Sequence, residues 1–106
     1  MPNAILAQTI QQGKASYYAD KFHGKLTANG EIYHTDSLTA AHRKFPFGTV
    51  VKVTNLKNKK TVLVRINDRG PFVRDRIIDL SKKAMEMLGG LKAGVIDIRV
   101  EIETSQ

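Results

Sequence analysis

Three short stretches of the sequence place an ionisable side chain beside turn-forming residues. They contain Glu31, His42 and Asp68, within the stretches Thr27-Ala28-Asn29-Gly30-Glu31, Leu38-Thr39-Ala40-Ala41-His42 and Arg65-Ile66-Asn67-Asp68-Arg69-Gly70-Pro71. Carboxylic acids and histidines are the side chains that most often transfer protons in enzymes. Loops held by a rigid scaffold are also where such residues concentrate. The three stretches are therefore candidates for acid–base chemistry.

Asp68 is the most informative of these candidates. Alternation along residues 62–68 places it on the same side as three apolar residues, the side expected to face inward. Desolvation there would favour the protonated carboxyl, which a general acid working near neutral pH requires. The structural alternative is that Asp68 begins the turn at residues 69–71 by accepting a hydrogen bond from its own backbone, and the residue types alone favour this alternative.

His42 and Glu31 also have structural alternatives. A lone histidine after two alanines is more often a hydrogen-bonded structural residue than a catalyst, and Glu31 after Asn29-Gly30 is typical of a solvated loop. The three histidines are separated by 11 and 8 residues, which matches none of the compact spacings used for zinc, and the chain has no cysteine. We therefore expect no metal and no cofactor.

Asp79 and Arg69 lie near the third stretch. Asp79 precedes a predicted helix, so it is either a carboxylate favoured by the helix dipole or a second acid in the same cleft. Arg69 is one of four arginines that flank these carboxylates. Its planar guanidinium suits an acidic group of a substrate, and a surface ion pair is the alternative.

The elements that must position these residues are mostly strands. Alternating apolar residues predict an antiparallel hairpin over residues 51–54 and 61–66, with a basic tip at residues 56–60, and a last strand over residues 96–103 with a charged, solvated face. The segment 24–48 carries turn signals around short apolar pieces, which predicts short strands and functional loops. The pattern favours a small β-barrel.

One short helix is predicted from Ser81 to Leu88. Ser81 can cap its start, and Gly89-Gly90 can end it. Its buried face is expected to comprise Leu80, Ala84, Met87 and Leu88.

The length and net charge of the chain limit its domain organisation and the partners it can bind. The 106 residues suffice for one domain, with residues 1–12 as an arm or leader remnant and residues 13–106 as the barrel. No apolar run approaches the roughly 20 residues that cross a bilayer. The net charge of +7 favours polyanionic partners such as nucleic acid, anionic lipid or acidic cell-wall polymer.

In this order, the motifs resemble the rare lipoprotein A family of bacterial cell-wall proteins, whose domain is a six-stranded double-psi β-barrel. The resemblance covers nearly everything except the first dozen residues. It departs from the family at Tyr17, where tryptophan is common, and at His34, where aspartate is common. It is carried by residues 13–18, 22–24, 27–31, 38–42, 46–49, 53–56, 67–71 and 76–81 and by the final strand.

The resemblance implies a lytic transglycosylase, which cleaves the bond between N-acetylmuramic acid and N-acetylglucosamine through attack by the muramic 6-hydroxyl. The family's functional positions fall on Glu31, His42 and Asp68, and related expansin-like barrels add weight to Asp79. Asp68 is the first choice for the proton donor and Asp79 the second. His42 would orient the acid or bind sugar, and Glu31 would bind sugar or stabilise positive charge.

The same resemblance implies substrate-binding roles for Asp79, Arg69, Asn67 and Tyr18. Tyr17 and Tyr18 could form an aromatic platform for a sugar ring, and packing in the core or at the rim is the alternative. The implied partner is the glycan strand of peptidoglycan, in the periplasm or cell envelope, at the outer membrane if a leader carries an anchor. A monomer is the default.

Two other functions stay open at this point. A non-catalytic, expansin-like module would bind cell-wall glycan through the same cleft without breaking bonds. A nucleic-acid-binding barrel ranks third, because the sequence has neither a basic helix nor an aromatic stacking motif. We therefore expect no nucleic-acid partner.

Overall fold

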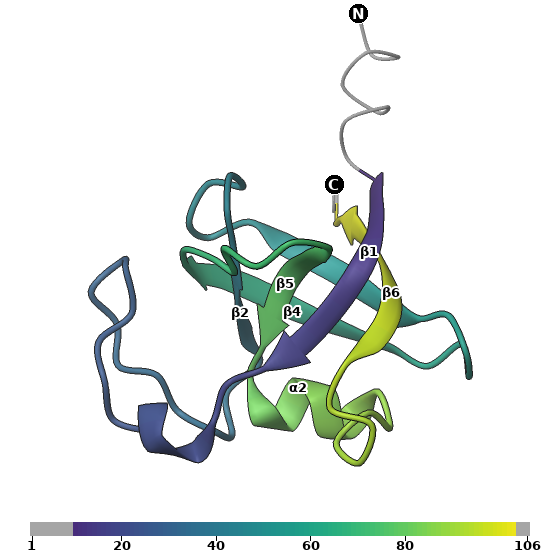
Figure 1. The fold of residues 1–106 in the computed structure, drawn as a ribbon. Coiled ribbons are helices and arrows are strands. Elements are labelled where there is room, and N and C mark those ends of the chain that lie inside the picture. The colour runs from purple at the N-terminus through teal and green to yellow at the C-terminus, as the bar shows by residue number, and fades with distance from the viewer. Residues whose placement is uncertain (1–9, 104–106) are drawn as a thin grey trace, which may run out of the picture.

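The computed structural model describes residues 10–103, which fold into one closed barrel (Figure 1). The barrel order is β1-β5-β2-β4-β3-β6. This confirms the predicted class, a mainly β, six-stranded barrel with one or two short helices. The elements are β1 Ile10–Tyr17, the 3-10 turn η1 Asp20–Phe22, β2 Thr39–His42, β3 Val50–Asn55, β4 Thr61–Asp68, β5 Arg76–Leu80, α2 Lys82–Met87 and β6 Ile96–Ile102.

The barrel mixes parallel and antiparallel strand pairs. β1 pairs with β5 and β2 pairs with β4 in parallel, and the other four pairs are antiparallel. The strands of each parallel pair are not consecutive along the chain, and a tight hairpin could not join them. The longest connection between consecutive strands, from β1 to β2, projects to one side of the barrel (Figure 1).

The register of four adjacent strands aligns the residues of interest. Ala41 in β2 lies opposite Asp68 in β4 on one side and opposite Asp79 in β5 on the other. Asp79 in turn lies opposite Ser16 in β1. The topology therefore brings two carboxylates that are distant in sequence into one row across the sheet, separated by a small alanine.

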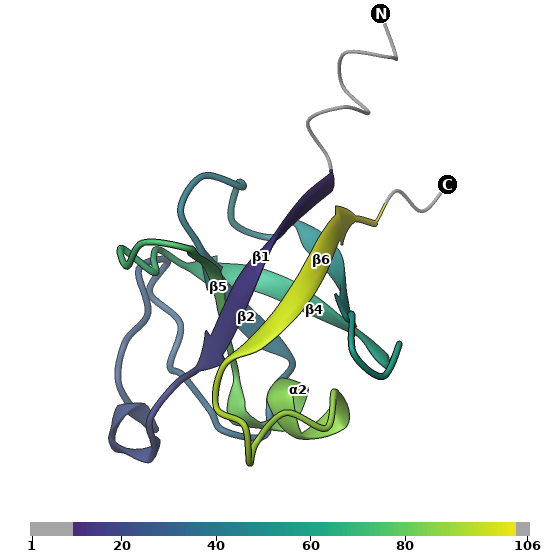
Figure 2. The ribbon, with the colours of Figure 1, turned by 45° about the vertical axis from the view of Figure 1, so that its right-hand side comes forward.

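The barrel begins earlier than predicted. β1 starts at Ile10 and pairs with β6 from that residue onward, where the two strands lie side by side (Figure 2). The predicted arm of residues 1–12 is therefore wrong for residues 10–12, because their backbone is used in the β1–β6 ladder. The rest of the arm, residues 1–9, lies outside the described residues, as do residues 104–106.

The hairpin, the last strand and the helix are confirmed. The Ser81 hydroxyl accepts a hydrogen bond from the Ala84 amide at the start of α2, and Gly89, with φ of 72°, ends the helix. The predicted buried face is wrong at one position. Met85 is fully buried and Met87 is exposed, because the face that packs on the barrel is centred on Ser81, Ala84 and Leu88.

The core fills the barrel with side chains from all six strands. The Ile77 side chain lies directly over Gly13 in β1: a Cβ added at Gly13 would lie 2.9 Å from Cγ2 of Ile77. A larger residue at position 13 would therefore displace the Ile77 side chain. The fully buried side chains include Ala15, Ala40, Val51, Val53, Ile66, Ile78, Leu80, Met85, Leu88, Ile98 and Val100.

Within residues 10–103, no helix has the length and apolar character needed to cross a membrane.

Candidate functional site

A cleft of about 640 Å³ lies over the row that joins Asp68 to Asp79. Of the predicted site residues, it is lined by Asp68, Asp79, Arg69 and Tyr18. A larger hollow of about 1300 Å³ lies elsewhere, between the β3–β4 tip and the start of β1, and includes none of them. The smaller cleft is therefore the candidate site.

Asp68 does not lie on the apolar face of β4. In the β2–β4 pairing, Ala40 lies opposite Ile66 and Ala41 opposite Asp68, so Asn67 is an extra residue. Such a bulge interrupts the alternation on which the parity prediction rests. The predicted apolar environment is therefore wrong: Asp68 is half-buried at the cleft and surrounded by hydrogen-bond donors.

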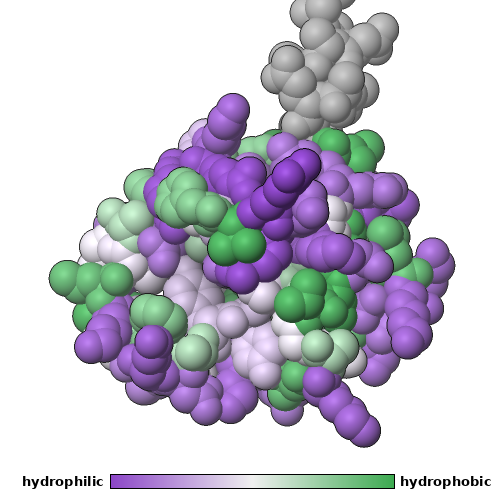
Figure 3. Space-filling view, viewed as in Figure 1, coloured by the Kyte–Doolittle hydropathy of each residue, from purple (hydrophilic) through white to green (hydrophobic). Residues whose placement is uncertain are grey.

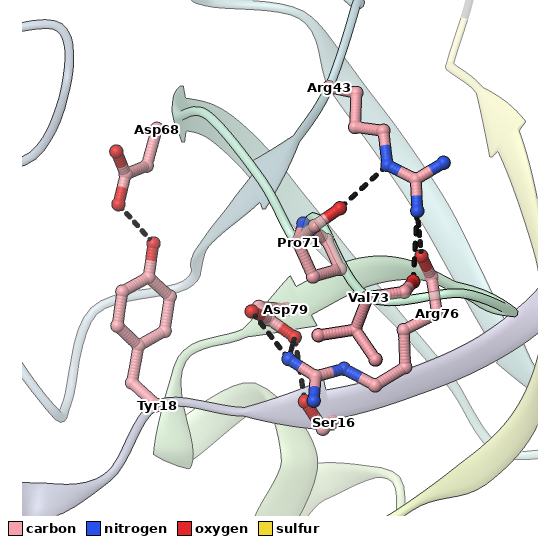
Figure 4. Close-up of polar contacts among 8 residues, drawn as sticks. All are labelled: Ser16, Tyr18, Arg43, Asp68, Pro71, Val73, Arg76 and Asp79. Carbon is pink, nitrogen blue, oxygen red and sulfur yellow. Dashed lines mark hydrogen bonds and ion pairs between the residues drawn. The ribbon is translucent and has the colours of Figure 1, made fainter.

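The two oxygens of the Asp68 carboxylate have different surroundings. Oδ1 accepts hydrogen bonds from the backbone amides of Ala28, at 2.8 Å, and Arg69, at 2.9 Å. Oδ2 accepts a hydrogen bond from the Tyr18 hydroxyl at 2.6 Å (Figure 4). The hydrogen bond from the Arg69 amide is the turn contact expected from the sequence as the structural alternative for Asp68. Oδ1 thus accepts hydrogen bonds from two amides, and Oδ2 accepts one from a hydroxyl.

Tyr18 contacts the site through its hydroxyl. Its ring is stacked on Tyr33, with centroids 4.4 Å apart, and Phe22 lies edge-on to it. Burial, followed by the hydrogen bond to Asp68, raises the pKa of Tyr18 far above its usual value. The phenol therefore stays protonated and donates to Asp68, and one face of its ring is covered by Tyr33.

Asp79 is held by two neighbours. Its Oδ1 accepts hydrogen bonds from the Ser16 hydroxyl, at 2.6 Å, and from Arg76, at 3.0 Å, and its Oδ2 accepts a second contact from Arg76 at 3.1 Å (Figure 4). The reading as a helix-start carboxylate is wrong, because Asp79 lies within β5 and Ser81 caps the helix. Asp79 is a fixed, charge-compensated carboxylate in the cleft.

The rim of the cleft carries exposed apolar side chains. Phe72 is 79% exposed, and Leu26 and Phe22 are also exposed. On the face shown in Figure 3, apolar residues form separate patches among hydrophilic ones. A cleft with isolated apolar contacts and convergent polar groups suits a hydrophilic ligand with small apolar faces.

Glu31 and Asn67 lie beside the cleft and are not among the residues that line it. Glu31 accepts hydrogen bonds from Arg65, at 2.9 Å, and from the buried side chain of Asn67, at 3.0 Å. The hydrogen bond from Arg65, supported by that from Asn67, lowers the pKa of Glu31. Glu31 is therefore a carboxylate that anchors residues 27–31 to β4.

The His42 side chain also lies away from the cleft. It is 4% exposed, its Nδ1 accepts hydrogen bonds from the amides of Lys44 and Phe45, each at 3.0 Å, and Nε2 lies 3.0 Å from Oε1 of Gln11. These contacts assign the proton to Nε2. Burial, with smaller effects from Arg69 and Arg43, lowers the pKa of His42 to about 4.

This pKa predicts how stability depends on pH. An unfolded histidine has a pKa near 6.5, so the unfolded chain binds the extra proton first as the pH falls. The stabilisation that neutral His42 gives the folded state is therefore complete above about pH 6.5. Between pH 6.5 and pH 4 the free energy of unfolding falls by up to about 3 kcal/mol. Urea unfolding of the wild type and of His42→Asn at pH 7, 6, 5 and 4 checks this. The difference between the two proteins should shrink as the pH falls, and a constant difference would contradict the neutral histidine.

Arg69 lines the cleft, but part of its guanidinium is already engaged. Nη1 donates hydrogen bonds to the carbonyls of His42, at 3.2 Å, and Phe45, at 2.9 Å. The guanidinium carbon lies 3.9 Å from the centroid of the Phe47 ring. Arg69 therefore connects the cleft to the loop after β2.

Several residues of the site carry no strong signal in the sequence. Ser16 faces Asp79 only because β1 pairs with β5, and Phe72 reaches the rim because the chain turns at Gly70-Pro71. Tyr17 lines the cleft but donates its hydroxyl to the carbonyl of Leu91. Among residues 10–103, no cluster of three or more acidic or histidine side chains is arranged to hold a metal ion.

Comparisons of the sequence agree on one family. The model of the lytic transglycolase family matches residues 10–100. The endolytic peptidoglycan transglycosylase RlpA of Campylobacter jejuni is 48% identical over 101 residues, which cover 95% of this chain and 37% of the relative. The protein of the same name from Vibrio cholerae is 53% identical over 94 residues, covering 89% and 36%. The chain thus spans little more than a third of these two relatives.

Comparisons of the structure agree on the fold. A Streptomyces papain inhibitor has a TM-score of 0.71 and 27% identity, over 90% of this chain and 94% of the inhibitor. The expansin of Clavibacter michiganensis has a TM-score of 0.71 and 23% identity, over 92% of this chain and 52% of the expansin, and shares the fold alone. With the barrel order, the family match and about half of all positions identical to the two relatives, the chain belongs to the rare lipoprotein A group of the lytic transglycolase family, whose domain is a double-psi β-barrel.

Proposed function

We propose that residues 10–103 form the catalytic domain of a peptidoglycan lytic transglycosylase. The domain would cleave the bond between N-acetylmuramic acid and N-acetylglucosamine and leave 1,6-anhydro-muramic ends. Relatives named endolytic peptidoglycan transglycosylase support this substrate, and the domain would act on it in the periplasm or cell envelope. The glycan strand is the proposed partner.

The unequal state of the two cleft carboxylates is the observation that carries this proposal. Asp79 receives both contacts of Arg76 and the Ser16 hydroxyl, so its charge is compensated and its position is fixed. Asp68 receives neutral donors only, and its Oδ2, which accepts one hydrogen bond rather than two, would exchange the proton. Of these two carboxyls, Asp68 is the one without an ion pair, and we assign it as the proton carrier. Hydrolysis of a glycoside commonly uses two carboxyl groups.

An intramolecular reaction needs only this one proton carrier. Protonated Asp68 donates its proton to the glycosidic oxygen as the bond to the muramic C1 breaks. The 6-hydroxyl of the same sugar attacks C1, and its proton passes to the Asp68 carboxylate, which restores the starting state. No water is consumed. Asp79 with Arg76, and the apolar side chain of Phe72, would hold sugars on either side of the reacting bond.

Glu31 and His42 have indirect roles in this proposal. Glu31, whose charge is compensated by Arg65, would hold the loop that donates the Ala28 amide to Asp68. His42 would act through the loop that it orders rather than by touching sugar.

Digestion of purified sacculi in water enriched with heavy oxygen tests the proposal. We expect anhydro-muramic ends without label, since the nucleophile is the sugar's own hydroxyl. A muramidase that hydrolyses the same bond is the control, and it must place one heavy oxygen at each new reducing end.

The other outcomes are equally informative. Labelled reducing ends would show that Asp79 or Glu31 activates water as a second carboxylate, which would overturn the mechanism and leave the substrate in place. Protein that pellets with sacculi but releases no sugar would establish the non-catalytic, glycan-binding module instead.

A further inference from the structure

Two loops beside the site are connected by arginine side chains. The loop after β2, residues 43–49, carries Arg43, and the loop after β4, residues 69–75, begins with Arg69. The second loop directly follows Asp68 and supplies Gly70, Pro71 and Phe72 to the cleft. Its conformation therefore sets where Asp68 lies relative to the rim.

Arg43 binds two backbone carbonyls of the second loop and one at the start of β5. Its Nε donates a hydrogen bond to the carbonyl of Pro71 at 2.6 Å. Its Nη2 donates to the carbonyls of Val73, at 3.0 Å, and Arg76, at 2.9 Å (Figure 4). A rigid, planar fork with several donors suits this arrangement, whereas a lysine ammonium has no such fork.

Arg69 makes the reciprocal contacts. Its Nη1 donates hydrogen bonds to the carbonyls of His42 and Phe45, and its guanidinium lies against the Phe47 ring. All three belong to the end of β2 or the first loop. Each loop thus supplies a guanidinium that binds carbonyls of the other.

His42 lies at the centre of this arrangement. Its Nδ1 accepts hydrogen bonds from the Lys44 and Phe45 amides, and its ring is stacked on Phe45 with centroids 3.8 Å apart. These contacts turn the first loop so that the Phe45 carbonyl faces Arg69. A protonated ring could not accept the two amides, and the low pKa of His42 keeps it neutral above about pH 4.

We propose that Arg43, Arg69 and His42 form a reciprocal arginine clasp that positions Asp68 and the 69–75 loop for the reaction. Arg43 and His42 are positioning residues that act through Arg69 and the loop backbone and do not touch the glycan. The clasp acts in the reacting complex, so this inference rests on the proposed function for its kinetic test. Apart from Arg43, the interior of the loop has few backbone hydrogen bonds: Lys14 donates to Asp75 and Arg76 donates to Val73.

Kinetics of Arg43→Gln and Lys44→Gln on soluble glycan strands provide the first test. Both variants remove one positive charge from the same exposed loop, but only Arg43 binds the second loop. We expect Arg43→Gln to lower kcat roughly 10- to 100-fold, because small misplacements of reacting groups cost this much. Its affinity for the strands should change by less than about threefold, and Lys44→Gln should stay within about twofold of the wild type in both measurements.

Chemical rescue separates positioning from general stability. Methylguanidinium added to Arg43→Ala should restore part of the lost kcat, whereas methylammonium at the same concentration should not. Arg43→Lys should recover less than methylguanidinium does, because one ammonium cannot reproduce the fork. If Arg43→Gln does not fold, kcat and affinity for the strands are measured for Arg43→Lys and compared with those of the wild type.

Two results would overturn the clasp while the wild type is active: an unchanged kcat in Arg43→Gln, or equal loss in Arg43→Gln and Lys44→Gln. A wild type that releases no sugar would instead contradict the proposed function. In that case, amide hydrogen exchange of residues 70–75 still tests the clasp. Faster exchange in Arg43→Gln than in Lys44→Gln supports it, and equal exchange excludes it.

Discussion

Asp68→Asn is expected to abolish cleavage of sacculi while binding to them persists. The amide keeps the shape of the carboxylate, and its oxygen can still accept the hydrogen bonds of the Ala28 and Arg69 amides. At the position of Oδ2 it presents an NH₂ group, which cannot take up and return a proton. Loss of a general acid or base typically lowers the rate by about 100- to 10,000-fold. Release of anhydro sugars, measured by mass spectrometry, gives the rate, and pelleting with sacculi gives the binding.

Asp79→Asn is the matched control for this prediction. It makes the same chemical change on the other side of Ala41, and it should weaken the contacts to Ser16 and Arg76 while leaving the proton carrier in place. We expect Asp79→Asn to retain much more activity than Asp68→Asn. If Asp68→Asn remains active while Asp79→Asn is inactive, the proton carrier is Asp79.

Leu80→Ala is expected to lower the free energy of unfolding by about 2 to 5 kcal/mol. Leu80 has 0% exposure, and its strand is held on both sides, by β1 and by β2. The pairing of β5 with both neighbours, together with the hydrogen bond from the Tyr18 amide to the Leu80 carbonyl at 3.0 Å, limits how far this backbone can collapse into the cavity. Chemical unfolding monitored by tyrosine fluorescence or circular dichroism measures the loss.

Leu63→Ala serves as the control for the core substitution. Leu63 is in β4 and is 46% exposed. Its truncation should cost less than about 1 kcal/mol, because little apolar area leaves the core. Equal losses for the two variants would mean that the barrel interior relaxes around a cavity at residue 80.

The strands were predictable where one face is buried and the other is solvated. The β3–β4 hairpin and β6 follow the alternation of apolar and polar residues, and Ser81 with Gly89 sets the limits of α2. Residues 10–12 were assigned to an arm and not to the barrel, because Ile10 is exposed and its place in the sheet comes from backbone pairing with β6. Pairing of this kind depends on distant residues and leaves little periodic signal.

The site was predictable as a set of residue types and not as an arrangement. The resemblance identified Asp68, Glu31 and His42, but residue spacing could not show that the bulge at Asn67 turns Asp68 toward the cleft. Nor could it show that His42 orders a loop, because its partners are backbone amides, which every sequence possesses. The partners of Arg43 are likewise backbone carbonyls.

The strand order also determines when this domain can fold during synthesis. Only β3 and β4 are neighbours both along the chain and in the barrel, so theirs is the one ladder that forms without closing a long loop. β6 pairs with both β1 and β3, and it is the last strand to be made. Until residues 96–102 are available, a nascent chain therefore exposes the unpaired edges of β1 and β3, which can pair with other chains. Completion of the barrel, and with it protection from aggregation, must wait for the C-terminal strand.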